Sequence, residues 1–120
     1  MDLKEGNVTI MVADMERAIQ FYVQTMGFTV RERHGDDWAE IQTPGLVIGI
    51  HPVSPGQQGK ASAGPLSIGW TVDRLEAVMA ALTQRGVRFE VREEGAVRLA
   101  FFQDVDSTPL YLCELKHPHA

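Results

Sequence analysis

The chain has 120 residues, of which 44% are hydrophobic and 22% are charged, and its formal net charge is −5 at pH 7. Such a composition is typical of a folded globular protein. The acidic balance argues against a nucleic-acid partner, because phosphate recognition needs clustered basic residues. No apolar run approaches the ~20 residues of a membrane-spanning helix, so we expect no membrane partner. Cys113, the single cysteine, cannot form an intrachain disulfide, and we expect a cytoplasmic location.

The first part of the chain changes its hydrophobic period at Asp14. Residues 7–12 alternate between apolar and polar side chains, which predicts a strand. Residues 14–26 then carry apolar side chains at helical spacing, which predicts an amphipathic helix. Asp14 can cap the first turn of this helix, and Gly27 suits the left-handed conformation that ends one.

Three more strands complete the first half of the chain. Alternation resumes in the segments 28–33 and 38–42, and the apolar run 46–50 is typical of a short buried strand. Turn-forming residues, among them Pro44 and Gly45, separate these segments. The first half therefore predicts the order β-α-β-β-β.

The second half repeats this order. The predicted elements are a strand over 66–72, a helix over 74–85 and strands over 87–91, 98–102 and 110–114. Asp73, with Glu76 three residues later, resembles a capping box at the start of the second helix. A shift of sixty positions lays Asn7 on Ser67, which indicates a duplicated module.

Two sequence motifs resemble the vicinal oxygen chelate superfamily, which includes glyoxalases, extradiol dioxygenases, and fosfomycin- and bleomycin-resistance proteins. The segment 12–28, which contains Asp14-Met-Glu-Arg17 and ends in Met26-Gly27-Phe28, is similar to the family's first-module helix. The segment 102–114 is similar to its final turn and closing strand. In that turn Val105, Ser107 and Thr108 replace the usual Pro, Gly and Asn.

The resemblance implies an α+β fold of two tandem βαβββ modules. The whole chain, residues 1–120, would form one domain of this family, with modules over about 6–51 and 65–115 and a linker over 52–64. In the family fold, the paired modules curl into a cup-shaped mixed sheet with the helices outside and the ligand inside.

The resemblance also indicates where a metal would bind. Metal-using members take one His, Glu or Gln ligand from the first and last strands of each module. The corresponding residues here are Asn7, Gly49, Ser67 and Tyr111. Glycine has no ligand atom, and the other three are poor ligands for transition metals. We therefore expect no metal and no other cofactor.

Strand parity and motif alignment also select candidates for ligand binding. They are Trp38, Glu40, His51, Phe101, Tyr111 and Met11. Trp38 suits a flat or cationic ligand, or it anchors a subunit interface. Glu40 either holds a cationic group or pairs with Arg31 or Arg33, which by parity can also face inward. His51 is either a ligand contact or a partly exposed histidine at the end of a strand.

Three functions are compatible with these residues. The leading hypothesis is a metal-free protein, like the bleomycin-resistance branch, that binds a planar or cationic small molecule and sequesters an antibiotic as a homodimer. The second is a lyase, isomerase or dioxygenase with displaced metal ligands such as His51 and Glu40. The third is a metal-independent enzyme that uses Tyr111, Glu40 or His51 as acid or base.

Overall fold

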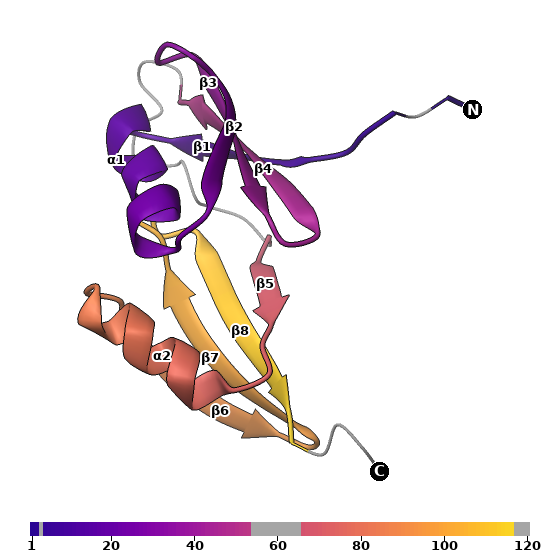
Figure 1. Ribbon diagram of the computed structural model, residues 1–120, viewed down its shortest axis with the longest axis vertical. Helices are drawn as coiled ribbons and strands as arrows, with labels where there is room; N and C mark the ends of the chain where they lie inside the picture. The colour runs from indigo at the N-terminus through magenta and orange to yellow at the C-terminus, as the bar shows by residue number, and fades with distance from the viewer. Residues whose placement is uncertain (3, 54–65, 117–120) are drawn as a thin grey trace. The chain divides into compact units, whose positions relative to one another are not determined.

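The computed structural model describes residues 1–2, 4–53 and 66–116. The chain divides into two compact units, Met1–Ala63 and Gly64–Ala120 (Figure 1). Each unit has the order β-α-β-β-β, which confirms the α+β class and the two tandem modules. Most of the predicted linker, residues 54–64, lies outside the described residues. Within the described part, no helix is long and apolar enough to cross a membrane.

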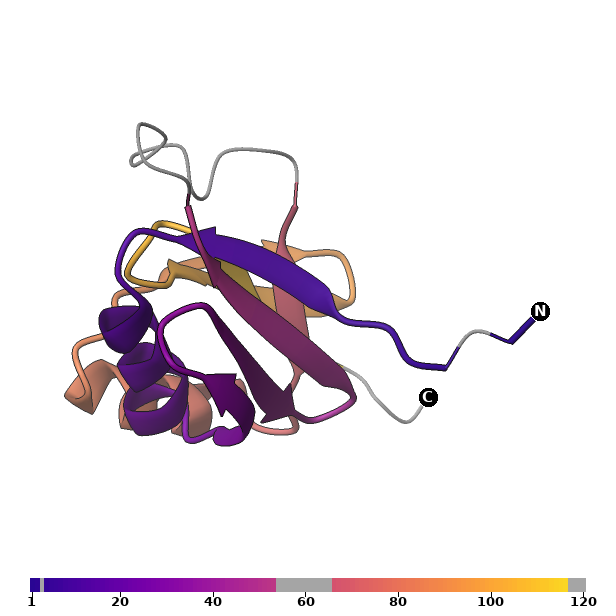
Figure 2. The same cartoon turned by 90° about the horizontal axis from the view of Figure 1, so that it is seen from above.

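The first unit forms a four-stranded sheet with strand order β1-β4-β3-β2. Its elements are β1 (Val8–Val12), α1 (Met15–Gln20), the π-helical turn η1 (Phe21–Thr25), β2 (Thr29–His34), β3 (Trp38–Thr43) and β4 (Leu46–Pro52). β1 runs parallel to β4, as Figure 2 shows, and the other pairs are antiparallel. Helix α1 packs against β4.

One face of this sheet forms the core of the first unit. On this face the buried apolar strand residues are Ile10, Val12, Ala39, Ile41, Ile48 and Ile50, and those of the helix are Met15, Ala18 and Ile19. Because successive side chains of a strand point to opposite faces, the residues between them point away from the helix. We call this side the helix-free face. It carries Thr9, Met11, Trp38, Glu40, Val47, Gly49 and His51.

The predicted ends of the first helix are confirmed. The Asp14 carboxylate accepts a hydrogen bond from the Arg17 N–H at 3.1 Å, so Asp14 is the N-cap. Gly27 has φ +82°, and the Phe28 N–H donates to the Tyr22 carbonyl at 2.9 Å. A left-handed glycine after the last turn is a common way to satisfy terminal carbonyls.

The second unit has the corresponding sheet order, β5-β8-β7-β6. Its elements are β5 (Ile68–Thr71), α2 (Leu75–Gln84), β6 (Glu90–Glu94), β7 (Val97–Gln103) and β8 (Pro109–Leu115). α2 packs on β7 and β8. The core residues include Ile68, Leu75, Leu82, Val87, Ala100, Phe102, Leu110 and Leu112.

The predicted capping box of α2 is wrong. Arg74 occupies the N-cap position, and its side chain makes no capping hydrogen bond. Instead the Glu114 carboxylate, from β8, accepts the hydrogen bond of the Leu75 N–H. A carboxylate on the last strand therefore neutralises the positive end of the helix, a tertiary contact that local spacing cannot reveal.

The turn between β7 and β8 is stabilised by Asp104. One of its carboxylate oxygens accepts hydrogen bonds from the N–H groups of Asp106 and Thr108, each at 2.8 Å. Ser107 adopts φ +64°, the left-handed region that favours glycine. The turn thus keeps its shape with serine where the family usually has glycine.

Candidate ligand-binding site

Gly49 lies at the centre of the helix-free face of the first unit. In the register of the sheet it pairs with Thr9 on β1 and with Glu40 on β3. A Cβ at Gly49 would be 2.3 Å from Trp38 Cη2 and 2.9 Å from Thr9 Oγ1. The indole of Trp38 therefore lies directly over the backbone of β4, and only glycine leaves room for it.

Glu40 holds this indole in place. The Trp38 Nε1–H donates a hydrogen bond of 3.1 Å to Glu40 Oε2. Both side chains are only partly exposed, and hydrogen bonds to a charged group are stronger than neutral ones. Trp38 and Glu40 thus form one unit, an aromatic ring with a carboxylate at its edge.

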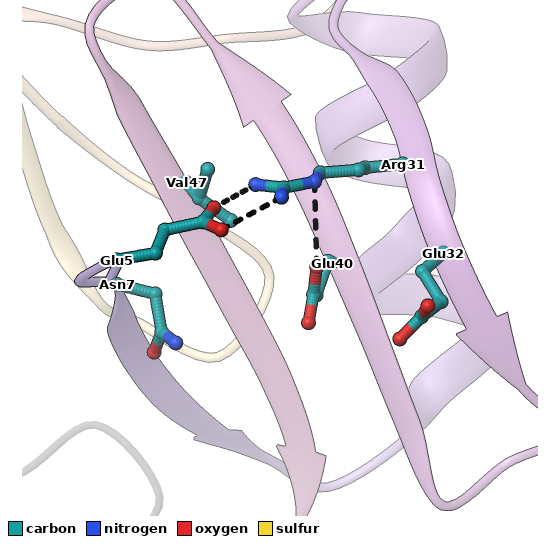
Figure 3. A pocket seen from close by; sticks show the side chains of 6 residues that line it. All are labelled: Glu5, Asn7, Arg31, Glu32, Glu40 and Val47. Carbon is teal, nitrogen blue, oxygen red and sulfur yellow. Dashed lines mark hydrogen bonds and ion pairs between the residues drawn. The ribbon is translucent and has the colours of Figure 1, made fainter. Parts of the chain in front are cut away.

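A pocket of about 290 Å³ lies beside this pair, entirely within the first unit. It is lined by Glu5, Asn7, Arg31, Glu32, Glu40 and Val47 (Figure 3). Three carboxylates therefore face a single guanidinium, and the pocket has an excess of negative charge. Such a lining favours a cationic ligand.

A β-bulge determines which residues of β2 reach the pocket. Val30 pairs with Ile41, but Glu32 pairs with Glu40, so Arg31 is an extra residue in the strand. Strict alternation would place Arg31 and Arg33 on the same face, but this shift of register places them on different faces. Arg31 lines the pocket. Arg33 instead donates hydrogen bonds to the carboxylates of Glu16, on α1, at 3.1 Å and of Asp36 at 3.0 Å.

Arg31 lies between two carboxylates, as Figure 3 shows. Its two terminal nitrogens donate to the two oxygens of Glu5, one of them at 2.8 Å. Its Nε is 3.7 Å from Glu40 Oε1, an ion pair without a hydrogen bond. The hydrogen bond from Arg31 lowers the pKa of Glu5, and the same bond raises the pKa of Arg31.

Glu32 and Glu40 are direct neighbours across β2 and β3. Like charges in directly opposite positions destabilise a sheet. His34 Nε2, two residues along the same strand, lies 3.1 Å from Glu32 Oε2. The opposed carboxylates are a local conflict of the kind that proteins retain at functional sites.

His51 and Met11 pair with each other at the end of the same face. His51 is exposed, and its Nδ1–H donates to the Pro52 carbonyl at 2.7 Å. This corresponds to the strand-end histidine considered from the sequence. A role for His51 or Met11 in ligand binding stays a prediction.

The second unit has an aromatic arrangement on the corresponding face of its own sheet. A Cβ at Gly69 would be 2.0 Å from Tyr111 Cζ, so the Tyr111 ring lies over the backbone of β5. The centroids of the Phe101 and Tyr111 rings are 6.3 Å apart, and the Arg92 guanidinium is 5.4 Å from the Phe101 centroid. Aromatic rings thus cover a glycine in both units.

The four family positions for metal ligands do not fit a metal. Gly49 has no donor atom and is covered by the Trp38 ring, and the ring of Tyr111 is packed over Gly69. The remaining two are an amide, Asn7, and a hydroxyl, Ser67. Nowhere in residues 1–2, 4–53 and 66–116 do three His, Cys, Asp or Glu side chains gather in a group suited to a metal ion.

Sequence reasoning did not select Glu5, Glu32 or Val47 as site residues. The parity of β1 contains the signal for Glu5, which lies two residues before Asn7 and four before Thr9. Residues at this spacing share a face if the extended chain continues. Glu32 could not be found in this way, because the bulge at Arg31 reverses the parity.

The family model of the Glyoxalase/Bleomycin resistance protein/Dioxygenase superfamily matches residues 6–107. The chain therefore belongs to this superfamily, as the two sequence motifs suggested. No protein of curated function matches the chain significantly.

Several solved structures resemble the whole chain. A glyoxalase family protein from Enterococcus faecalis is 26% identical with a TM-score of 0.77, covering 95% of this chain and 100% of that one. TnmS3, an antibiotic binding protein from Streptomyces sp. CB03234, is 25% identical with a TM-score of 0.70, covering 95% and 99%. SMU.1112c is 25% identical with a TM-score of 0.74, covering 94% and 100%.

Proposed function

We propose that this protein binds a planar organic cation without a metal, and that it sequesters an antibiotic or a similar compound rather than transforming it. The observation that carries the proposal is the pairing of opposed carboxylates with an aromatic ring on one face. Glu32 and Glu40 directly oppose each other, and Trp38 is bonded to Glu40. A flat cation would stack on the indole and place its charge between the carboxylates.

The similarity to TnmS3 supports the proposal, since that structure is an antibiotic binding protein and is similar over nearly its whole length. We also propose that Phe101 and Tyr111, in the second unit, contact a ligand.

We further propose that the protein forms a homodimer in the cytoplasm. β1 and β5 are edge strands of their own sheets, and edge strands favour pairing with another chain.

A comparison of two probes of the same shape tests the charge preference. Proflavine is a cationic three-ring compound, and 9-anthroate is an anionic one. We expect saturable quenching of tryptophan fluorescence by proflavine and much weaker binding of 9-anthroate. Trp70→Phe is the matched control, because Trp70 pairs with Leu112 on the helix side of its sheet. Saturable binding confined to 9-anthroate would overturn the proposal.

A further inference from the structure

The pocket contains one cation, Arg31, which can interact with two carboxylates. Arg31 donates two hydrogen bonds to Glu5 but none to Glu40. The distance from Arg31 Nε to Glu40 Oε1 is 3.7 Å. Paired hydrogen bonds from a guanidinium to a carboxylate have a favourable, fixed geometry. The arrangement therefore leaves Glu40 with a longer ion pair to Arg31 and no hydrogen bond from it.

We infer that Glu5 is a specificity-determining residue, which takes up the hydrogen bonds of the Arg31 guanidinium and so leaves the Glu40 carboxylate available to a cationic ligand. The inference rests on the proposed function and adds a role for a residue outside the sheet. Glu5 precedes β1 and lies across the pocket from β2 (Figure 3). It acts by positioning Arg31 and does not itself need to contact the ligand.

The consequence of losing Glu5 follows from the geometry. Without the Glu5 carboxylate, a small rotation of the Arg31 side chain brings its guanidinium into hydrogen-bonding distance of Glu40. The carboxylate would then be neutralised, and a like charge would stand beside the ligand's cationic group. The side chains of Arg31, Glu5 and Glu40 are 38%, 51% and 22% exposed, so solvent screens the effect and keeps it moderate.

The test uses Glu5→Gln, which removes the charge and keeps the shape of the side chain. We expect the dissociation constant for proflavine to rise about three- to fivefold, the size of a partly exposed ion pair. Acridine, which has the same three rings and is neutral at mildly basic pH, should bind the variant as it binds the wild type. An equal change for both probes would show a structural effect and overturn the inference.

A second variant separates positioning from a direct effect of the Glu5 charge. Arg31→Met should strengthen proflavine binding, since it removes the competing cation. In that background Glu5→Gln should lose most of its effect, because no guanidinium remains to be positioned. Equal weakening in both backgrounds would mean that Glu5 acts on the ligand directly, and the inference would be wrong.

An NMR measurement separates failure of the inference from failure of the proposed function. In the free protein the guanidinium signals of Arg31 should change in Glu5→Gln, because glutamine can accept only one of the two hydrogen bonds and carries no charge. Unchanged Arg31 signals would overturn the inference, whether or not the wild type binds proflavine. Absence of saturable proflavine binding to the wild type would instead overturn the proposed function and, with it, the specificity role.

Discussion

Gly49→Ala probes the packing that defines the candidate site. The new Cβ would be 2.3 Å from Trp38 Cη2 and 3.0 Å from Cζ2. Because favourable carbon–carbon contact begins near 3.5 Å, the indole would have to move by about 1.2 Å. A movement of this size would disrupt the hydrogen bond between the indole and Glu40.

The expected loss of stability depends on whether the indole stays and overpacks against the new Cβ or moves outward. Overpacking typically costs about 1–3 kcal/mol, and Trp38 is partly exposed, so its ring can swing outward. Loss of the hydrogen bond to Glu40 contributes about 1 kcal/mol within this range. We therefore expect Gly49→Ala to lower the free energy of unfolding by about 1–3 kcal/mol and to weaken proflavine binding.

Urea unfolding followed by circular dichroism measures the stability change, because this signal does not depend on the tryptophan itself. Gly6→Ala is the matched control, since a Cβ there has no neighbour within 4 Å. In a Trp38→Ala background, the cost of Gly49→Ala should fall sharply, leaving the contact with Thr9. An undiminished cost in that background would refute the proposed position of the indole.

Three further changes test separate parts of the structure. Glu114→Ala should lower stability by about 1–2 kcal/mol through loss of the α2 cap, whereas Asp73→Ala should have little effect in the same thermal melts. Ser107→Gly should raise stability by about 0.5–1 kcal/mol by relieving a left-handed serine, and Gly95→Ser, at φ +60°, should lower it similarly in urea unfolding. The pKa of Glu5 is lowered by a hydrogen bond from its guanidinium partner. Its contribution to stability is therefore present above the ordinary value of 4.5 and is lost as the pH falls through the lower folded-state value. Thermal melts of Glu5→Gln over that acid range should show a flatter pH dependence than the wild type.

The modules and their core could be predicted because their signals are local. The apolar parity of β1 and the helical spacing after Asp14 set which side chains are buried, and Val12 and Ala18 are fully buried as that pattern requires. Gly27 marks the end of the helix because a left-handed residue is needed there.

The details of the site could not be predicted, because they depend on contacts between distant residues. The bulge at Arg31 adds one residue to β2, and this places Arg31 and Arg33 on different sides of the sheet. Nothing in the local sequence identifies that extra residue. Similarly, Glu114 caps a helix that starts 39 residues earlier, so its role becomes visible only in the folded unit.

The most direct test of the central claim is an NMR titration of the protein with proflavine. The claim is that a planar cation binds on the helix-free face of the first unit, at Trp38 and Glu40. We predict that the Trp38 indole N–H and the Gly49 amide shift saturably with a common dissociation constant, while the Trp70 indole N–H changes little. Saturable shifts that leave Trp38 and Gly49 unaffected would contradict the account.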